Sequence, residues 1–467
     1  MFNHNALILS LALATVAGCS GEDLADPPSL QNETTPTWGG KPITDINPDP
    51  SIVEINLVAR EALIALEEGS ITRMYSFNGT VPGPTIEANV GDELIVHFKN
   101  ELSEPTTIHW HGMRVPNAMD GTPRVQAPVA PGETFEYRFI IPDAGTYWYH
   151  PHVRTHEQVE RGLYGPIVIH DPVYDPDYDL ERVLVLDDIR IEDDGQISPF
   201  SPARDGMHGR SGNYLLTNGR RYDLAEGSAP LGSLERWRIV NSANARRMIV
   251  GNSNGTMKVI ATDGGLLDAP YEVNRLSLAP GERYDIEVRL SQPNHELISY
   301  VMALDDNNEI TELELPVFRV QTRAHKSSDS PVAGVLTWPT LPPSPTREIT
   351  RTETILFDGI NDPEKGLRWR LNGKSDWEEP LFSFSKGDTV RISLRNLAGP
   401  EHPFHLHGQF FKVLDPPRPG LKDTVLVPGM STVEIEAYFD NVGHWMAHCH
   451  ILEHAALGMM ASIEVTP

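Results

Sequence analysis

Three stretches of the chain alternate apolar and polar residues, in the pattern of a strand with one buried face. In the first stretch, Phe135, Tyr137 and Phe139 lie on one side, and the charged Glu136 and Arg138 lie on the other. The three stretches are 134–140, 284–290 and 432–439. Because successive side chains of a strand point to opposite faces, each stretch predicts a half-buried β-strand.

A Pro-Gly pair precedes each predicted strand and indicates the turn that leads into it. The pairs are Pro131-Gly132, Pro280-Gly281 and Pro428-Gly429, about 149 residues apart. A repeat of this length matches the usual size of a domain. We therefore expect three related domains at 51–172, 173–325 and 351–467, with a Pro-rich linker at 326–350. The 37 glycines and 39 prolines favour an all-β fold with many turns.

The first and third copies agree in further detail. Each contains a predicted strand that opens with Gly-Asp and ends at an Asn, and a His-x-His motif follows nine residues later. Each also has a glycine that is followed five residues later by a second His-x-His motif. The four motifs hold His109 and His111, His150 and His152, His405 and His407, and His448 and His450. The middle copy has neither motif, and we interpret it as a metal-free spacer.

The histidine pairs indicate a copper site. Two histidines separated by one residue on a strand point to the same side. Four such pairs present eight neutral imidazoles, which suits copper and exceeds the needs of any zinc site. Matched offsets in two copies argue against chance, since a lone His-x-His is most often a polar surface pair.

The segment around Cys449 predicts a second centre beside the first. On an extended backbone the Cys449 side chain points away from those of His448 and His450. His454 follows the Cys by five residues, Met459 by ten, and His402 lies just before the third motif. One Cys, two His and a weak axial Met form the ligand set of a blue-copper electron-transfer site. Cys449 would join the two centres through its own backbone.

Four motifs together resemble those of multicopper oxidases, most closely the three-domain, laccase-like bacterial members. They are His109-Trp110-His111-Gly112, Tyr149-His150-Pro151-His152, His402-Pro403-Phe404-His405-Leu406-His407-Gly408 and His448-Cys449-His450-Ile451-Leu452-Glu453-His454. The resemblance covers about residues 50–467. It implies an all-β fold of three cupredoxin-like, Greek-key β-sandwich domains.

The resemblance also implies four copper ions and a role for each ligand. His402, Cys449, His454 and the axial Met459 would hold the mononuclear blue copper. His109 and His405 would hold the single copper of a trinuclear cluster. The coupled copper pair would take His111, His150, His152, His407, His448 and His450.

Three further positions are interpreted through the same resemblance. Asp120 matches the acid that supplies protons near the cluster, although it could be an ordinary loop carboxylate. Ala455 stands where many bacterial relatives have an acid, so a proton relay there is in doubt, and Glu453 is either a substitute or a structural acid. His156 lacks an adjacent Cys, and we expect it not to be a ligand.

The implied reaction couples four one-electron oxidations to the reduction of O2 to two waters. Phenolic or aromatic amine donors are favoured because the 12 methionines form no cluster of the kind seen in copper-defence oxidases. The alternative is a metallo-oxidase of Cu(I) or Fe(II) in copper or iron homeostasis. A non-catalytic copper-binding or scaffold protein on the same fold is the second alternative.

Charge and the first residues indicate partners and location. The formal net charge of −27 argues against a nucleic-acid partner, because phosphate binding needs clustered cations. Residues 6–18 form an apolar run that fits a secretory signal and ends at Cys19, similar to a bacterial lipoprotein signal, although the usual preceding basic residues are missing. We expect a signal peptide at 1–18, a flexible tether at 19–50, and an exported monomer that is periplasmic or anchored to the outer membrane through Cys19.

Overall fold

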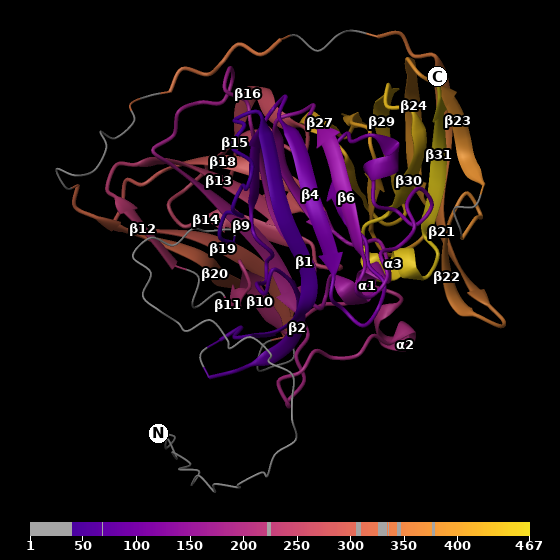
Figure 1. Cartoon of the computed structure of the whole chain (residues 1–467), viewed down its shortest axis with the longest axis horizontal. Coiled ribbons are helices and arrows are strands. Elements are labelled where there is room, and N and C mark those ends of the chain that lie inside the picture. Colours follow the sequence, from indigo (N-terminus) through magenta and orange to yellow (C-terminus); the bar gives the residue numbers. More distant parts are fainter. Residues whose placement is uncertain are drawn as a thin grey trace, which may run out of the picture.

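The computed structural model describes residues 40–67, 69–221, 226–304, 310–325, 334, 336–342, 347–375 and 379–467. The predicted signal peptide, Cys19 and much of the predicted linker lie outside these residues. The described chain forms three β-sandwiches, each built from two sheets. In Figure 1 the middle sandwich lies to the left of strands β1, β4 and β6, and the third sandwich lies to their right.

The first sandwich contains eight strands. They are β1 (Ile52–Ile64), β2 (Thr72–Phe77), β3 (Ile86–Asn89), β4 (Glu93–Asn100), β5 (His109–His111), β6 (Thr134–Ile140), β7 (Gly145–His150) and β8 (Gly165–His170). Their order is β2-β1-β4-β6 in one sheet and β3-β8-β7-β5 in the other. A 3-10 helix, η1 (Asn117–Met119), and a short helix, α1 (Thr155–Gln158), lie in its loops.

The middle sandwich has sheets ordered β11-β10-β9-β13-β18-β15-β16 and β12-β20-β19-β14-β17. Its strands are β9 (Leu180–Ile189), β10 (Tyr214–Thr217), β11 (Arg220–Arg221), β12 (Glu226–Pro230), β13 (Leu234–Asn241), β14 (Met248–Asn252), β15 (Met257–Thr262), β16 (Gly265–Val273), β17 (Leu276–Leu278), β18 (Arg283–Arg289), β19 (Asn294–Leu304) and β20 (Ile310–Arg323). Helix α2 (Pro202–Asp205) lies between β9 and β10.

The third sandwich has sheets ordered β22-β21-β24-β29-β26-β27 and β23-β31-β30-β25-β28. Its strands are β21 (Arg351–Asp362), β22 (Gly366–Leu371), β23 (Pro380–Ser385), β24 (Asp388–Asn396), β25 (His402–Leu406), β26 (Phe411–Asp415), β27 (Pro417–Lys422), β28 (Thr424–Val427), β29 (Thr432–Phe439), β30 (Gly443–Cys449) and β31 (Met460–Thr466). Helix α3 (Leu452–Ala456) follows β30.

The same pairing recurs in all three sandwiches and confirms the predicted repeat. A parallel pair is followed by an antiparallel pair, as in β1·β4 and β4·β6. The middle sandwich repeats this with β9·β13 and β13·β18, and the third with β21·β24 and β24·β29. The three strands predicted from alternation correspond to β6, β18 and β29, so they hold the same place in each sandwich.

Burial follows the predicted alternation in β6 and β29, where the apolar face is covered and the polar face is open or half-buried. In β18 only the first part of the polar face is buried: Asp285 is 1% exposed, whereas Glu287 is half-buried and Arg289 is exposed. Here Asp285 accepts hydrogen bonds from Arg236 and from the Thr146 hydroxyl of the first sandwich. A sandwich-to-sandwich contact therefore covers Asp285, which the pattern alone assigns to solvent.

Each sandwich has its own apolar core, and a fourth apolar cluster joins all three. This fourth cluster includes Trp148 of the first sandwich, Val183 of the middle one and Leu452 of the third. Strand β7 contacts β13 and β18, strand β27 contacts β15 and β16, and α1 contacts α3. The three sandwiches thus meet next to β7 and β30, two of the strands that carry histidine motifs.

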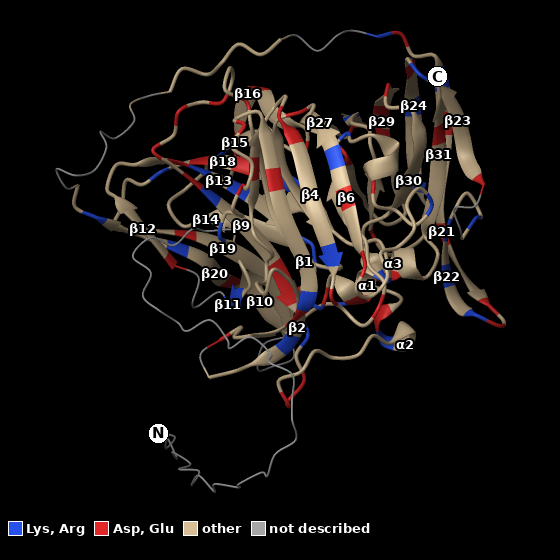
Figure 2. Ribbon diagram, viewed as in Figure 1, with Lys and Arg blue, Asp and Glu red and all other residues tan. Residues whose placement is uncertain are grey.

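Charged residues are spread over all three sandwiches, with both signs interspersed on many strands (Figure 2). None of the helices in the described part of the chain is both long and apolar enough to cross a membrane.

Candidate metal centre

In the first sandwich, β5 and β7 bring two histidine pairs together. Strand β5 places His109 and His111 on one side, with ring centroids 5.9 Å apart. His109 lies opposite His150 in the antiparallel register of β5 and β7. His152 follows directly after β7, and its ring lies 4.8 Å from that of His109. The four imidazoles of this sandwich therefore face one space.

The third sandwich repeats this arrangement with β25 and β30. His405 lies opposite His448, and Phe404 lies opposite Cys449. His407 follows directly after β25, and its Nε2 lies 3.2 Å from the Nε2 of His448. His448 and His450 flank Cys449, so the strand directs their rings toward one side and the sulfur toward the other.

The two half-sites meet face to face between the sandwiches. The ring of His109 stacks on His407 with centroids 3.9 Å apart, and His111 stacks on His405 at 3.8 Å. Ring nitrogens come within 4.8 Å of one another in four groups of three that cover all eight histidines. The groups are His109, His152 and His407; His109, His111 and His405; His111, His150 and His450; and His405, His407 and His448.

A separate group lies on the other side of β30. The Cys449 Sγ is 3.6 Å from the Nδ1 of His402 and 3.6 Å from the Nδ1 of His454. The two Nδ1 atoms are 3.0 Å apart. Met459 is fully buried in the same apolar core, and its backbone carbonyl accepts a hydrogen bond from the Cys449 amide. The axial role of Met459 stays a prediction.

Hydrogen bonds set the tautomer of several of these rings. The Nδ1 atoms of His109, His150, His405 and His448 each lie 2.8–3.0 Å from a backbone carbonyl oxygen. A carbonyl only accepts, so each Nδ1 carries the proton and each Nε2 keeps a lone pair. The Nε2 atoms of His109, His150 and His405 are buried without a partner. Buried nitrogens left unpaired in this way fit a site that binds metal ions.

The electrostatics fit the same conclusion. Burial lowers the pKa of His402 to about 3, and burial with a neighbouring histidine lowers that of His448 to about 3. The rings are therefore neutral, which is the form that binds metals. Burial raises the pKa of the Cys449 thiol well above its ordinary value, so only a bound cation would hold it as a thiolate there. Neutral imidazoles and a thiolate suit copper.

Two aspartates contact the stacked histidines on the side of each ring that faces away from the cluster. Each aspartate uses its backbone carbonyl for one histidine and its carboxylate for another. The backbone carbonyl of Asp120 accepts from His109 in its own sandwich, and its carboxylate accepts from His407 of the third sandwich at 3.1 Å. The backbone carbonyl of Asp423 accepts from His405, and its carboxylate lies 3.3 Å from the Nε2 of His111. Each aspartate thus joins a ligand of its own sandwich to one of the other.

Sequence reasoning found Asp120 but missed Asp423. Asp120 lies 11 residues after His109, whereas Asp423 lies 18 residues after His405, so matched offsets did not reveal the second aspartate. Burial alone would raise the pKa of Asp423, but the Arg283 guanidinium and hydrogen bonds from His111 and His405 hold that pKa well below its ordinary value.

The remaining predicted positions lie outside these groups. Glu453 is buried and accepts a hydrogen bond from the Asn244 side chain of the middle sandwich at 2.8 Å. His156 packs against Phe200, with centroids 4.3 Å apart. Within the described ranges, neither belongs to a group of metal-ligating atoms. Ala455 is buried in α3.

Comparison with known proteins agrees along nearly the whole described chain. Three family models, each described as multicopper oxidase, match residues 59–173, 197–318 and 343–467. The multicopper oxidase MmcO of Mycobacterium tuberculosis is 30% identical over 85% of this chain and 84% of its own length. Laccase-2 of Cryptococcus neoformans is 28% identical over 91% of this chain and 86% of its own length.

Solved structures show the same fold. The multicopper oxidase of Pseudomonas thermotolerans has a TM-score of 0.77 at 30% identity, over 90% of this chain and 100% of that one. A Campylobacter jejuni multicopper oxidase described as a metallo-oxidase has a TM-score of 0.79 at 28% identity, over 93% and 96% of the two chains. The sandwiches are therefore cupredoxin-like, and the chain belongs to the multicopper oxidase family, with bacterial multicopper oxidases among its relatives.

Proposed function

We propose that the chain is a laccase-like oxidase that couples four one-electron oxidations of phenolic or aromatic amine donors to the reduction of O2 to two waters. Its family makes it a copper-dependent oxidoreductase. The observation that carries the proposal is the presence of two complete groups of ligand-type side chains, one on each side of β30.

The first group would hold the mononuclear blue copper. His402, Cys449 and His454 converge there, and Met459 is the proposed axial ligand. Bound copper would supply one-electron redox chemistry, while the protein fixes the positions of the ligands. The backbone of Cys449 joins the sulfur to His448 and His450 through covalent bonds alone. This continuity gives electrons a short path from one group to the other.

The second group would hold three copper ions. His109 and His405 are the proposed ligands of the single ion. His111, His150 and His450 form one triad of the coupled pair. His152, His407 and His448 form the other, with ring centroids 4.9–5.5 Å apart. The unpartnered Nδ1 of His111 indicates binding through that atom, because its Nε2 already contacts Asp423 and Thr424.

Asp120 is the proposed proton carrier beside the cluster. Its carboxylate is fully buried, and its Oδ2 lies 3.1 Å from the Nδ1 of His407. A proton held on this carboxylate would be close to the site where oxygen gains negative charge.

Burial of the first group supports small one-electron donors. His402 and His454 are fully buried, and the Trp369 ring lies 5.0 Å and 4.7 Å from their rings. The Trp369 indole donates to the carbonyl of Gly206 in the middle sandwich. A donor would therefore release its electron from the surface without touching a ligand ring, which suits outer-sphere transfer from phenols and aromatic amines.

A metallo-oxidase of Cu(I) or Fe(II) is the second candidate. Its support is the structural likeness to the Campylobacter jejuni metallo-oxidase and the formal net charge of −27, which attracts cations.

Copper quantitation and oxygen uptake test the proposal. The full chain is stripped with a chelator, reloaded with copper, and assayed with a phenol, an aromatic amine, Cu(I) and Fe(II), after correction for uncatalysed oxidation. We expect copper-dependent oxygen uptake with the organic donors. Uptake with the metal ions alone would support the second candidate. Tight copper binding without uptake would indicate a non-catalytic copper protein.

A further inference from the structure

The middle sandwich contributes to the wall of the histidine cluster although it supplies none of the predicted ligands. Its turn at Gly281, just before β18, lies directly against two ligand rings. A Cβ built on Gly281 would come within 3.0 Å of the Cε1 of His111 and of the Cδ2 of His450. Two residues further along the chain, the buried side chain of Arg283 reaches the same place.

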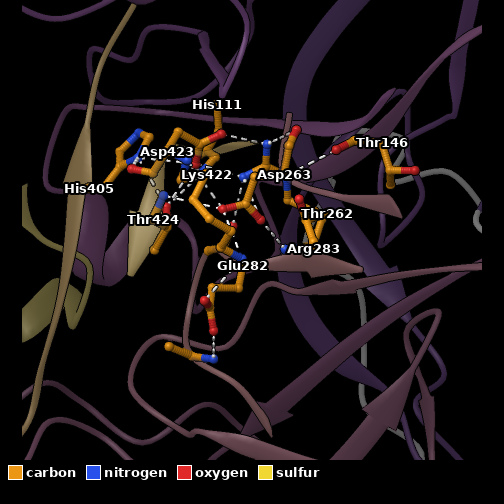
Figure 3. Close-up of polar contacts among 12 residues, drawn as sticks. His111, Thr146, Thr262, Asp263, Glu282, Arg283, His405, Lys422, Asp423 and Thr424 are labelled. Atoms are coloured by element: carbon orange, nitrogen blue, oxygen red, sulfur yellow. Dashed lines mark hydrogen bonds and ion pairs between the residues drawn. The ribbon is translucent and has the colours of Figure 1, made fainter. Parts of the chain in front are cut away.

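Arg283 contacts all three sandwiches through its guanidinium group (Figure 3). Its Nε donates to the carbonyl of Thr146 in the first sandwich at 2.9 Å. Its two terminal nitrogens donate to the Asp423 carboxylate in the third sandwich at 2.7 and 2.6 Å, and to the carbonyls of Gly281 and Asp263 in its own sandwich at 3.1 and 3.0 Å. All five N–H protons of the guanidinium therefore have an acceptor.

Asp423 in turn contacts ligands from two sandwiches. Its Oδ1 lies 3.3 Å from the Nε2 of His111 and 3.4 Å from the Nδ1 of His405. The Thr424 hydroxyl donates to the same oxygen at 2.9 Å and lies 3.1 Å from His405. Hydrogen bonds to the far side of a metal-binding imidazole fix its tautomer and its ring orientation.

Further contacts hold this aspartate in place. Asp263 of the middle sandwich accepts hydrogen bonds from the backbone amides of Asp423 and Thr424 at 3.3 and 3.2 Å. The ammonium group of Lys422 is fully buried, 3.1 Å from Asp263 and 3.0 Å from Glu282. The middle sandwich therefore binds the side chain just before Asp423 and the backbone amides of Asp423 and Thr424.

We infer that Arg283 is a positioning residue of the copper cluster, through which the middle sandwich holds Asp423 against His111 and His405. The inference rests on the proposed function, since it needs copper ions at those histidines. Lys cannot replace this arrangement, because an ammonium group has three donors and no planar fork to match a carboxylate. The middle sandwich thus helps to hold two ligands of the cluster in place, in addition to acting as a spacer.

Copper affinity of the full chain tests the inference, with Arg283→Met and Arg283→Lys as variants. Loss of a hydrogen-bonding partner behind a metal ligand weakens metal binding by roughly 10- to 100-fold. We expect that loss at the cluster for Arg283→Met, and a smaller loss for Arg283→Lys, measured by competition with a copper chelator. The electron paramagnetic resonance signal of the cluster should change, while the visible absorption of the thiolate-bound copper stays as in the wild type.

Arg182→Met is the matched control. Arg182 is also a buried arginine of the middle sandwich, and it makes a two-pronged ion pair with Glu235 at 2.6 and 2.8 Å. This pair lies within the middle sandwich, so its loss should leave cluster affinity and the resonance signal unchanged.

The outcomes are distinguishable. If the wild type binds no copper at the cluster, the proposed function fails. If the wild type binds copper and both Arg283 variants bind it equally well, the inference is wrong while the function stands. An equal loss in Arg182→Met would assign the effect to general destabilisation and overturn the inference. If Arg283→Met does not fold, Arg283→Lys, which keeps the buried positive charge, decides the matter alone.

Discussion

Most histidine rings at the junction of the sandwiches are held by an oxygen atom on the side away from the cluster. For His109, His150, His405 and His448 the oxygen belongs to a backbone carbonyl, and for His407 and His111 it belongs to a carboxylate. The ring orientations are therefore set by the protein in the absence of metal. Such preorganisation lowers the cost of ordering the ligands when ions bind.

Cys449 belongs to the first group of ligands and not to the second, so its replacement distinguishes the two groups. Replacement by Ser keeps a small polar side chain but removes the thiolate, because a serine hydroxyl does not ionise readily. We expect Cys449→Ser to lose the visible absorption of the blue site while the cluster still binds copper. Absorption spectra and copper content of the reloaded protein measure both effects.

Ala447→Ser is a suitable control, because Ala447 is fully buried on the same strand, β30. It adds a hydroxyl without removing the sulfur and should keep the colour. A Cys449→Ser protein that remains blue would contradict the assignment.

For single residues, the sequence predicts the ligands far better than the residues that hold the ligands in place. The His-x-His spacing marks imidazoles that point to the same side, and the structure brings all of them together. No spacing pattern of this kind identifies Asp423 or Arg283. Their importance depends on contacts between residues that are 140 positions apart in the chain. Only the folded arrangement of three sandwiches makes those contacts visible.

At the scale of the element, glycine turns decide how closely the sandwiches approach. Gly112 ends the first His-x-His motif with a φ of +86°, and a Cβ there would overlap the Arg283 guanidinium and the Asp423 carboxylate. Gly132 has a similar φ of +82°, but nothing lies within 4 Å of its Cβ position. The two turns share a backbone conformation and differ in what they pack against.

This pair yields a controlled prediction. A non-glycine residue in this conformation costs about 1–3 kcal/mol, so both Gly112→Ala and Gly132→Ala should destabilise the protein. Gly112→Ala should cost more, and it should also lower the copper content because it displaces Arg283 and Asp423. Thermal unfolding of the metal-free protein and copper analysis after reloading measure the difference. Equal losses in the two variants would count against close packing at Gly112.

Alternation predicts strands well, because a strand that covers a core needs one apolar face. It predicts β6 and β29 with their open faces. It does not predict that Asp285 of β18 is buried, because that residue is covered by β7 of another sandwich, more than a hundred residues away.

At the scale of the whole molecule, a cluster of buried neutral histidines makes the metal-free fold sensitive to acid. Histidine in an unfolded chain has a pKa near 6.5. Burial lowers the pKa of His402 and His448 to about 3, and it lowers that of His111, His150, His152, His407, His450 and His454 too. Below pH 6.5 these histidines therefore bind protons in the unfolded chain, whereas in the folded chain they stay neutral.

The metal-free protein should thus lose stability as the pH falls from about 6.5 toward about 3, with each such group contributing up to about 1.4 kcal/mol per pH unit. Melting temperatures between pH 7 and pH 5 measure this, above the range in which ordinary carboxylates titrate. His402→Phe should reduce the dependence, because it removes one of the buried histidines. A melting temperature independent of pH over this range would contradict the burial argument.

Local sequence patterns predict only part of how the three sandwiches are organised. The histidine count and the matched copies indicate that the two outer sandwiches share one site. The part played by the middle sandwich is not indicated, because that sandwich has no ligand motif and contacts the cluster through the turn at Gly281 and the side chain of Arg283.

The reciprocal stacking of His109 on His407 and of His111 on His405 also bears on biosynthesis. Asp120 and the His407 that it contacts are 287 residues apart, so the first half-site leaves the ribosome long before its counterpart exists. Copper ions that need both half-sites would therefore bind after translation, once the outer sandwiches have docked. A prematurely terminated chain would offer the ions only the four imidazoles of the first sandwich, without the rings of His405 and His407 that stack on His111 and His109.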